Sequence, residues 1–314
     1  NILSAHFFAD AVMKLAKKSR VSLQKIDLIG SHGQSIHHIP GKRKKFGKTV
    51  RSTLQIGDPS TIAKLTAVVT VGDFRTADMA VGGQGAPLVP FLDYVLFRSR
   101  KKSRLLLNLG GIANITSLPK DCSVEEVMAF DTGPANMIID GLMKKLYGRS
   151  FDRGGKVARS GTVLPGLKEW MSRGEYYRLR PPKSTGRELF SDEYLRRLLQ
   201  RSGQNRKNDV IATATEFTAY SVYDQYLRFI SKRAPVDEVI ASGGGVHNKT
   251  MMQALRKYFS PIPVLSIEHL GVSPDAKEAI LFAVLANETI SERPSNVPGA
   301  TGAKKPVVLG KICL

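Results

Sequence analysis

Three glycine-rich turns carry residue types that could bind a phosphate group. They are NLGGIAN (108–114), between two expected strands, and DTGPAN (131–136) and GGGVHN (243–248), each between an expected strand and an expected helix. Glycine lets backbone N–H groups approach a phosphate closely, and a helix N-terminus adds partial positive charge. Each turn alone has an ordinary structural explanation, but three in order favour a phosphate site. None matches the P-loop or the dinucleotide fingerprint.

Asp131 is the candidate catalytic group. It stands at the mouth of an expected strand, beside Gly133 and the start of an expected helix at Pro134. A carboxylate there could hold a water or a hydroxyl group as a general base. It could equally serve as the N-cap of that helix. The local sequence leaves both interpretations open.

Two polar loops carry side chains suited to a sugar or carboxylate ligand. His32 and Gln34 follow an expected strand, and the loop 72–90 brings Asp73, Arg75, Asp78 and Gln84. Forked donors and acceptors of this kind bind hydroxyl and carboxylate groups. The alternative is an internal salt-bridge network that holds a long loop. In the same way, Lys183, Ser184 and Arg187 could touch phosphate or only order their own loop.

A metal site is not expected in this chain. Three of its six histidines, His32, His37 and His38, share one loop, without a cysteine or a carboxylate cluster beside them. The two cysteines, Cys122 and Cys313, have neither disulfide nor zinc spacing, which favours a reducing compartment.

The elements that must position these residues alternate between strands and helices. Helices are expected at 4–18, 87–97, 191–202, 209–232 and 274–290, and short strands stand between and around them. The segment 41–48 (GKRKKFGK) is expected to be a loop because of its glycine and charge content. This alternation predicts an α/β fold with mixed sheets and two lobes. We place lobe I at 1–103 and lobe II at 104–314, and expect the tail 291–314 to pack back on lobe I.

Composition excludes several other classes of protein. The chain has 314 residues, of which 42% are hydrophobic and 24% charged, so it is not wholly disordered, collagenous or a coiled coil. No apolar run approaches the roughly 18 residues of a membrane span. Forty-seven Lys and Arg against 27 Asp and Glu give a net charge of +20. Such an excess is typical of proteins that bind nucleic acid or acidic membranes, so the placement of the basic residues along the chain has to be considered.

Taken together, these segments resemble the anhydro-N-acetylmuramic acid kinase family. The resemblance runs from one end of the chain to the other, and the combination of motifs is far more specific than any single turn. The matching segments are 26–41, 52–63, 71–91, 106–116, 130–140, 181–190, 242–255, 273–287 and 295–312. The resemblance implies the two-lobed fold of sugar kinases, actin and the Hsp70 ATPase, a ribonuclease H-like fold.

The activity that the resemblance implies is an unusual phosphoryl transfer. ATP and Mg²⁺ serve to phosphorylate the 6-oxygen of 1,6-anhydro-N-acetylmuramic acid while water opens the anhydro ring. The product is N-acetylmuramic acid 6-phosphate, in peptidoglycan recycling. Asp131 matches the family's water-activating base. The implied sugar-binding residues are His32, Arg75, Asp78, Gln84 and Glu278. The implied nucleotide-binding residues are Gly110, Gly111, Asn114, Gly243, Gly244, Gly245 and Asn248.

Two features depart from the family pattern. Members begin with a strand that carries a G-T-S-x-D-G phosphate turn, and this chain starts at Asn1 without it. Lobe I is therefore expected to be incomplete at its N-terminal side, and a catalytically dead sugar-binding or regulatory derivative is the alternative function. The second departure is the basic insert 41–48.

The expected partners are an amino sugar and ATP. The basic residues are scattered and lack the interleaved aromatic residues of an RNA platform, so nucleic acid is not expected. A membrane partner is not expected either. At the level of the family, a homodimer and a cytoplasmic location are expected.

Overall fold

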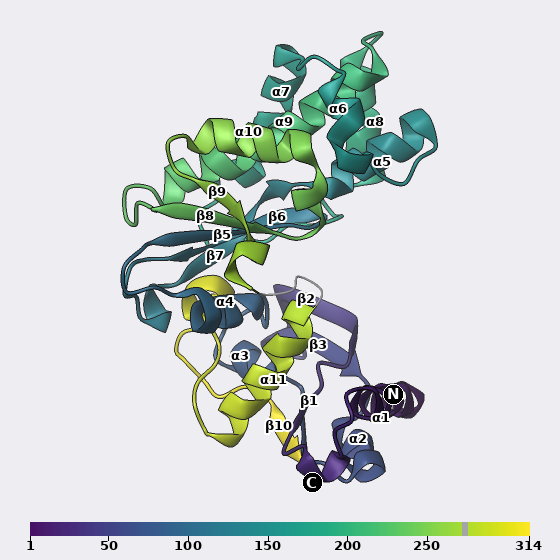
Figure 1. Ribbon diagram of the computed structural model, residues 1–314, viewed down its shortest axis with the longest axis vertical. Coiled ribbons are helices and arrows are strands. Elements are labelled where there is room, and N and C mark those ends of the chain that lie inside the picture. The colour runs from purple at the N-terminus through teal and green to yellow at the C-terminus, as the bar shows by residue number, and fades with distance from the viewer. Residues whose placement is uncertain (272–275) are drawn as a thin grey trace. The chain divides into compact units, whose positions relative to one another are not determined.

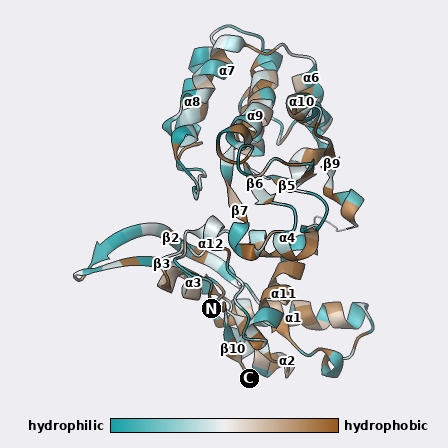
Figure 2. Cartoon of the chain, turned by 90° about the vertical axis from the view of Figure 1, so that its left-hand side faces the viewer, coloured by the Kyte–Doolittle hydropathy of each residue, from teal (hydrophilic) through white to brown (hydrophobic). Residues whose placement is uncertain are grey.

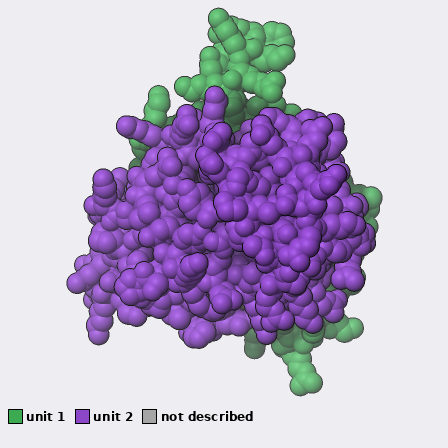
Figure 3. Space-filling model, turned by 90° about the horizontal axis from the view of Figure 1, so that it is seen from above, with its two compact units in different colours: residues 1–95, 275–314 green, residues 96–274 purple. Residues whose placement is uncertain are grey.

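The computed structural model describes residues 1–271 and 276–314. Contacts within the chain divide it into two compact units, Asn1–Val95 with Asp275–Leu314 (unit 1) and Leu96–Pro274 (unit 2), coloured separately in Figure 3. The division expected from the sequence differs, since it put the boundary near residue 103 and gave the segment after 274 to lobe II. The C-terminal segment belongs to unit 1 because its last strand pairs with a strand of that unit.

Unit 1 is built on a small three-stranded sheet. Its order is β1-β4-β10, with β1 and β4 parallel and β10 antiparallel to β4. Asp58 caps one of its helices, because its Oδ2 accepts from the Thr61 N–H at 2.7 Å. The elements of this unit are α1 (Ile2–Lys18), β1 (Ile29–Gly30), β2 (Gln34–Lys45), β3 (Lys48–Ile56), α2 (Pro59–Thr66), β4 (Thr70–Gly72), α3 (Thr76–Ala80), α11 (Lys277–Ile290), α12 (Pro298–Thr301) and β10 (Lys311–Cys313), with α4 (Val89–Phe97) running on into unit 2.

A long antiparallel hairpin extends from unit 1, as Figure 2 shows. It consists of β2 and β3, and it is closed by Phe46 and Gly47, whose φ angles are 48° and 74°. Two successive positive φ angles are the signature of a two-residue turn that matches the twist of the strands. The expectation of a loop at 41–48 is therefore wrong: this segment forms the end of the hairpin.

Unit 2 contains a five-stranded sheet in the order β7-β6-β5-β8-β9 (Figure 1). The first three strands along the chain pair antiparallel, and β8 and β9 run parallel to β5. The strands are β5 (Arg104–Leu109), β6 (Ile112–Leu118), β7 (Met128–Pro134), β8 (Glu238–Ser242) and β9 (Val264–Ser266), and the helices are α5 (Asn136–Tyr147), α6 (Lys156–Arg159), α7 (Pro165–Ser172), α8 (Asp192–Ser202), α9 (Lys207–Phe229) and α10 (Lys249–Phe259). This strand order, 3-2-1-4-5 along the unit, is that of a ribonuclease H-like sheet. The expected α/β fold class is confirmed.

The main hydrophobic core lies between one face of this sheet and its helices. Leu105, Leu107 and Leu109 of β5 are fully buried there, together with apolar residues of α5, α9 and α10. Alternate residues of a strand point to opposite faces, so Asn108 of β5 points away from this core. The helices therefore leave the polar face of the sheet to the candidate site.

Two expected element boundaries differ from the structure. The sequence put Pro134 in the first turn of a helix, but Pro134 ends strand β7, and the helix begins at Asn136. Proline is tolerated there because β7 is an edge strand. The expected start of the last helix at Pro274, with Asp275, lies outside the described residues.

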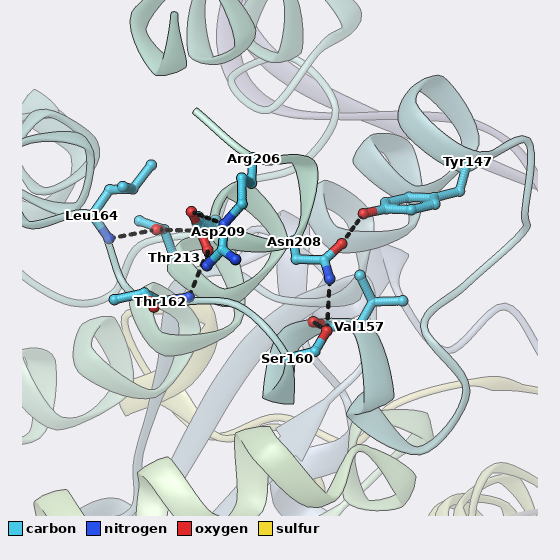
Figure 4. A network of polar contacts seen from close by, with 9 residues as sticks. All are labelled: Tyr147, Val157, Ser160, Thr162, Leu164, Arg206, Asn208, Asp209 and Thr213. Atoms are coloured by element: carbon cyan, nitrogen blue, oxygen red, sulfur yellow. Dashed lines mark hydrogen bonds and ion pairs between the residues drawn. The ribbon is translucent and has the colours of Figure 1, made fainter. Parts of the chain in front are cut away.

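A polar network anchors the segment 157–164 to the start of α9 (Figure 4). The Thr162 N–H donates to Asp209 Oδ1 at 2.7 Å, and the Leu164 N–H donates to Thr213 Oγ1 at 2.9 Å. Asn208 Nδ2 donates to Ser160 Oγ at 2.7 Å. Because these bonds satisfy backbone groups of an irregular segment, they hold it in one conformation beside the buried helix α9.

Candidate active site

A row of polar residues crosses four strands of unit 2. Ser242 of β8 is in register with Asn108 of β5, Asn108 with Asn114 of β6, and Asn114 with Asp131 of β7. Residues directly opposite each other on neighbouring strands place their side chains on the same face. Asp131 and Asn114, two of the expected site residues, are therefore cross-strand neighbours on the face that points away from the core.

Asp131 has the surroundings of a base. Its Oδ2 accepts from the Thr185 N–H at 2.8 Å, and among the described residues Oδ1 has no hydrogen-bond partner. Burial raises the pKa of Asp131 to about 6, against the opposing effects of the Thr185 N–H and Lys183, while the charge of Glu188 raises it further. The alternative of an N-cap is wrong, because Asp131 lies within β7 and the helix starts at Asn136.

Lys183 holds the loop that contacts Asp131. Its side chain is 7% exposed, and its Nζ donates to Gln225 Oε1 at 2.5 Å and to the Tyr176 carbonyl at 3.1 Å. The rings of Tyr176 and Phe229 lie 4.7 and 4.9 Å from Nζ. Burial lowers the pKa of this lysine to about 8. Of the two interpretations open for Lys183, the structure favours the ordering of its loop over contact with phosphate.

The glycines at 110 and 111 are not required by packing within the protein. A Cβ at Gly110 would lie no closer than 3.5 Å to any neighbour, and one at Gly111 no closer than 3.4 Å, which are ordinary contacts. Their carbonyls accept from the first N–H groups of α5, at 3.1 Å from Asn136 and 3.0 Å from Met137. In the part of the chain that the structure describes, no backbone carbonyl accepts from the Gly110 or Gly111 N–H. These two groups could meet a phosphate.

The second glycine turn combines structural and open positions. A Cβ at Gly245 would lie 2.5 Å from Leu109 Cβ, and Gly243 has a φ of 81° and approaches the Leu109 backbone, so packing requires both. At Gly244 the nearest atom is 4.0 Å away, which leaves this position open. Asn248 caps α10, since its Oδ1 accepts from the Met251 N–H at 3.0 Å. Of these four expected nucleotide-binding residues, Gly244 is the one whose residue type the protein's own packing does not explain.

A pocket of about 280 Å³ lies at this open glycine. Asn136, Asp140 and Phe151 line it opposite Gly244, His247 and Asn248. Burial raises the pKa of Asp140 to about 6. Asp140 and Phe151 are not among the site residues expected from the sequence. The available signal was spacing: Asp140 follows Asn136 by one helical turn, so both side chains lie on one face of α5.

In unit 1, His32, Arg75 and Glu278 form a second cluster. Arg75 Nε donates to His32 Nε2 at 3.0 Å, and His32 Nδ1 contacts the Gly33 carbonyl at 2.9 Å, which fits a neutral imidazole with its proton on Nδ1. Burial and the charge of Arg75 lower the pKa of His32. Burial also lowers the pKa of Arg75, and the charge of Glu278 opposes this. A neutral imidazole, a guanidinium and an exposed carboxylate thus share one surface.

Close packing of β1 on α11 brings this cluster together. A Cβ at Gly30 would lie 2.0 Å from the Phe282 carbonyl oxygen, so only glycine fits there. The Phe282 ring lies 4.7 Å from the His32 ring. Since His32 follows β1 and Glu278 opens α11, this contact fixes their spacing.

Asp78 and Gln84 differ in their access to a ligand. Asp78 is fully buried, and its carboxylate accepts from the Gly85 N–H at 2.8 Å, from Asn296 Nδ2 at 2.8 Å and from Thr301 Oγ1 at 2.7 Å. Gln84 has a backbone N–H that donates to the Thr301 carbonyl at 2.9 Å, and no described residue bonds its side-chain amide. Gln84 can therefore offer its amide to a ligand, whereas the carboxylate of Asp78 is already engaged.

No group of three or more His, Cys, Asp or Glu residues that could hold a metal ion occurs within residues 1–271 and 276–314. The same ranges contain no helix long and apolar enough to cross a membrane.

Comparison with known proteins identifies close relatives of this chain. A family model described as anhydro-N-acetylmuramic acid kinase matches residues 3–314. The anhydro-N-acetylmuramic acid kinase of Caldanaerobacter subterraneus subsp. tengcongensis is 48% identical over 100% of this chain and 80% of its own length. The protein of that name from Salinibacter ruber is 47% identical over 98% of this chain and 78% of its own length. Among solved structures, an activator of 2-hydroxyisocaproyl-CoA dehydratase from Clostridium difficile aligns at 14% identity over 78% of this chain and 88% of its own, with a TM-score of 0.41.

Proposed function

The chain belongs to the anhydro-N-acetylmuramic acid kinase family, and from that premise we propose how its own residues carry out the reaction. The protein is a carbohydrate kinase that uses ATP in amino sugar recycling. It phosphorylates 1,6-anhydro-N-acetylmuramic acid at the 6-oxygen and opens the anhydro ring with water. The surroundings of Asp131 carry the assignment of catalytic roles. Its carboxylate has one bonded oxygen, one open oxygen and a pKa raised to about 6.

Asp131 is the general base. A water bound at its open Oδ1 attacks the anomeric carbon and gives one proton to the carboxylate. The bond from the anomeric carbon to the 6-oxygen breaks, and that oxygen attacks the γ-phosphorus of ATP as the bond to ADP breaks. A pKa of about 6 leaves the carboxylate ionised at neutral pH and makes it a stronger proton acceptor than an ordinary aspartate.

The sugar is held by the cluster of unit 1. Arg75 suits the carboxylate of the acidic sugar through Nη2, since its Nε donates to His32 and its Nη1 donates to the Gly85 carbonyl at 2.7 Å. The amide of Gln84 and the exposed carboxylate of Glu278 suit its acetamido and hydroxyl groups. Asp78 holds the loop instead of touching the sugar, because all its bonds run to the protein. His32 orients Arg75.

The nucleotide is held by the open glycines of unit 2. The free N–H groups of Gly110 and Gly111 suit phosphate oxygens. The pocket beside Gly244 suits the nucleoside, with Asp140 as acceptor for ribose hydroxyls and Phe151 for contact with the base. Asn114 lies next to Asp131 in the strand register and faces the same reacting groups.

Mg²⁺ would enter with the ATP phosphates. This ion keeps several waters and takes one or two carboxylates beside phosphate oxygens, so a cage of three acidic residues is not needed. Glu188, whose charge raises the pKa of Asp131, fits as a carboxylate near the transferred group. The ion would neutralise part of the negative charge of the phosphate groups.

The experiment is to identify the product made by the full chain. Incubation with ATP, Mg²⁺ and 1,6-anhydro-N-acetylmuramic acid is expected to release one ADP for each N-acetylmuramic acid 6-phosphate, measured by mass spectrometry and a coupled ADP assay. The matched control substrate is N-acetylmuramic acid without the anhydro bridge. We expect it to react far more slowly, because its 6-oxygen is not released by attack at the anomeric carbon.

Two results would overturn this proposal. Equal turnover of the open sugar would remove the need for a water-activating base. Binding of the anhydro sugar with no turnover would favour the alternative of a dead derivative, which no relative's name supports. A homodimer and a cytoplasmic location stay predictions.

A further inference from the structure

The end of the β2–β3 hairpin is a continuously exposed stretch of unit 1. We define the hairpin tip as residues 42–51. Residues 42–50 are all exposed, and Phe46, at the turn, is fully exposed. An aromatic side chain with no protein contact loses the stabilisation that burial would give it. The hairpin projects from unit 1 (Figure 2), and Phe46 stands in the turn that joins its two strands.

All the charged residues of the hairpin are positive. The tip contains Lys42, Arg43, Lys44, Lys45, Lys48 and Arg51, and no acidic residue occurs between Gln34 and Ile56. Lys45 and Lys48 stand directly opposite each other in the strand register. Like charges in that position repel, so folding alone does not explain them. A negatively charged partner would offset the repulsion.

A basic groove lies at the base of the tip. It has a volume of about 710 Å³ and contains Lys42 and Arg51 of the hairpin with Lys304 and Lys305 of the C-terminal segment. The described residues that line it include no carboxylate. They include the hydroxyl groups of Thr49, Ser52, Thr53 and Thr76. Such a lining suits phosphate headgroups, which accept hydrogen bonds and carry negative charge.

We propose that the hairpin tip docks this protein on an anionic lipid bilayer, with Phe46 inserted among the headgroups and the basic residues behind it. An apolar group outermost with cations around it is the arrangement that interfacial anchors use. Each Lys or Arg near an anionic surface adds to the attraction. Single-stranded RNA is the less suitable partner, because its binding uses several aromatic side chains as stacking platforms, and the tip offers one.

This proposal departs from the expectation that no membrane is a partner. The sequence placed 41–48 in an irregular loop, in which the direction of Phe46 is undefined. In the structure Phe46 stands in the two-residue turn of the hairpin, and the register gathers the lysines behind it.

The test is sedimentation of the full chain with vesicles of phosphatidylglycerol mixed equally with phosphatidylcholine. We expect binding that weakens with salt and is absent with pure phosphatidylcholine. Phe46→Ser is expected to weaken binding about tenfold, and Lys44→Glu/Lys45→Glu by about twentyfold or more. Kinase activity without vesicles should stay unchanged in both variants, which would show that they fold. In Phe46→Trp, the new indole fluorescence should shift to the blue with anionic vesicles, over the constant signal of Trp170.

The matched control is Lys232→Glu/Arg233→Glu, two exposed neighbouring cations of unit 2 with the same change of charge. It should weaken binding by less than about twofold. Equal losses in the two charge-reversed pairs would show attraction by net charge alone and would overturn the proposal. Tighter binding to polyuridylate RNA than to the vesicles would also overturn it, and so would the absence of a fluorescence shift in Phe46→Trp.

Discussion

Each of the two units holds one aspartate among the site residues that the family resemblance implies, and their surroundings differ. Asp78, in unit 1, is fully buried, and three donors from separate parts of that unit reach its carboxylate. Asp131, in unit 2, has one donor on one oxygen and a pKa raised to about 6. The first carboxylate joins α3, the turn at residue 85 and the C-terminal segment. The second keeps an oxygen open for a ligand.

The difference shows how to separate a structural from a catalytic carboxylate. A buried charge that receives a full set of hydrogen bonds is compensated, and it stabilises the elements that donate to it. A partly buried carboxylate with few donors costs folding free energy and gains proton affinity, which is useful for catalysis. Substitutions at both kinds of position test this distinction.

Asp131→Asn should lower kcat by about 10²- to 10⁴-fold, because it removes the proton acceptor. The same change should leave the protein as stable or raise its stability at pH 7 by up to about 3 kcal/mol, since it removes an ionised group whose pKa burial has raised by about two units. Steady-state kinetics and thermal unfolding at pH 7 measure the two effects. Unchanged kcat, or a clear loss of stability, would place Asp131 with Asp78 as a structural residue.

Asp78→Ala should produce the opposite pattern. It removes the acceptor of the Gly85 N–H and of the Thr301 hydroxyl, and one of the two acceptors of Asn296 Nδ2, so the free energy of unfolding should fall by about 2–3 kcal/mol. The kcat of the folded protein should change only a few-fold. Denaturant unfolding and kinetics below the new melting temperature check this. A variant of normal stability with a greatly raised KM for the sugar would instead make Asp78 a sugar ligand.

A pair of neighbouring glycines repeats the comparison on a smaller scale. Gly245→Ala places a methyl group 2.5 Å from Leu109 Cβ and should cost about 1–3 kcal/mol of stability. Gly244→Ala meets open space, so it should leave the melting temperature unchanged while the KM for ATP rises about tenfold, because its methyl group enters the nucleotide pocket. Loss of stability in both variants, with no change in this KM, would refute the assignment of the pocket.

Much of this arrangement could be predicted from the sequence. Alternating periodicity predicts the α/β class, and the glycine turns at 108–114 and 243–248 lie at strand ends, where short-range patterns are informative. The resemblance of the motifs to the kinase family indicates the phosphoryl transfer. The structure excludes the N-cap interpretation of Asp131 because strand β7 runs on to Pro134, which a local pattern with an early proline does not reveal.

The other features of the fold and the site depend on contacts between residues that are far apart in the sequence. Three donors to Asp78 come from residues 85, 296 and 301, and nothing local to α3 indicates them. The hairpin required pairing of 34–45 with 48–56, and its charged, exposed residues lack the alternation that marks a half-buried strand. Asp140 became visible only when the pocket joined α5 to the 243–248 turn.

Lys183 offers the finest test, because it acts on Asp131 without belonging to the reacting groups. The kcat/KM of the parent should rise with pH through about 6 as Asp131 loses its proton. The Lys183 ammonium lowers the pKa of Asp131, so Lys183→Met should move this rise to higher pH, and Lys183→Arg should restore part of it by keeping the charge. A purely structural lysine would lower the melting temperature and leave the midpoint in place. A shift of the midpoint in Lys183→Met but not in Asp78→Ala would show that the proton affinity of the base is set within unit 2, by the loop that also donates the Thr185 N–H.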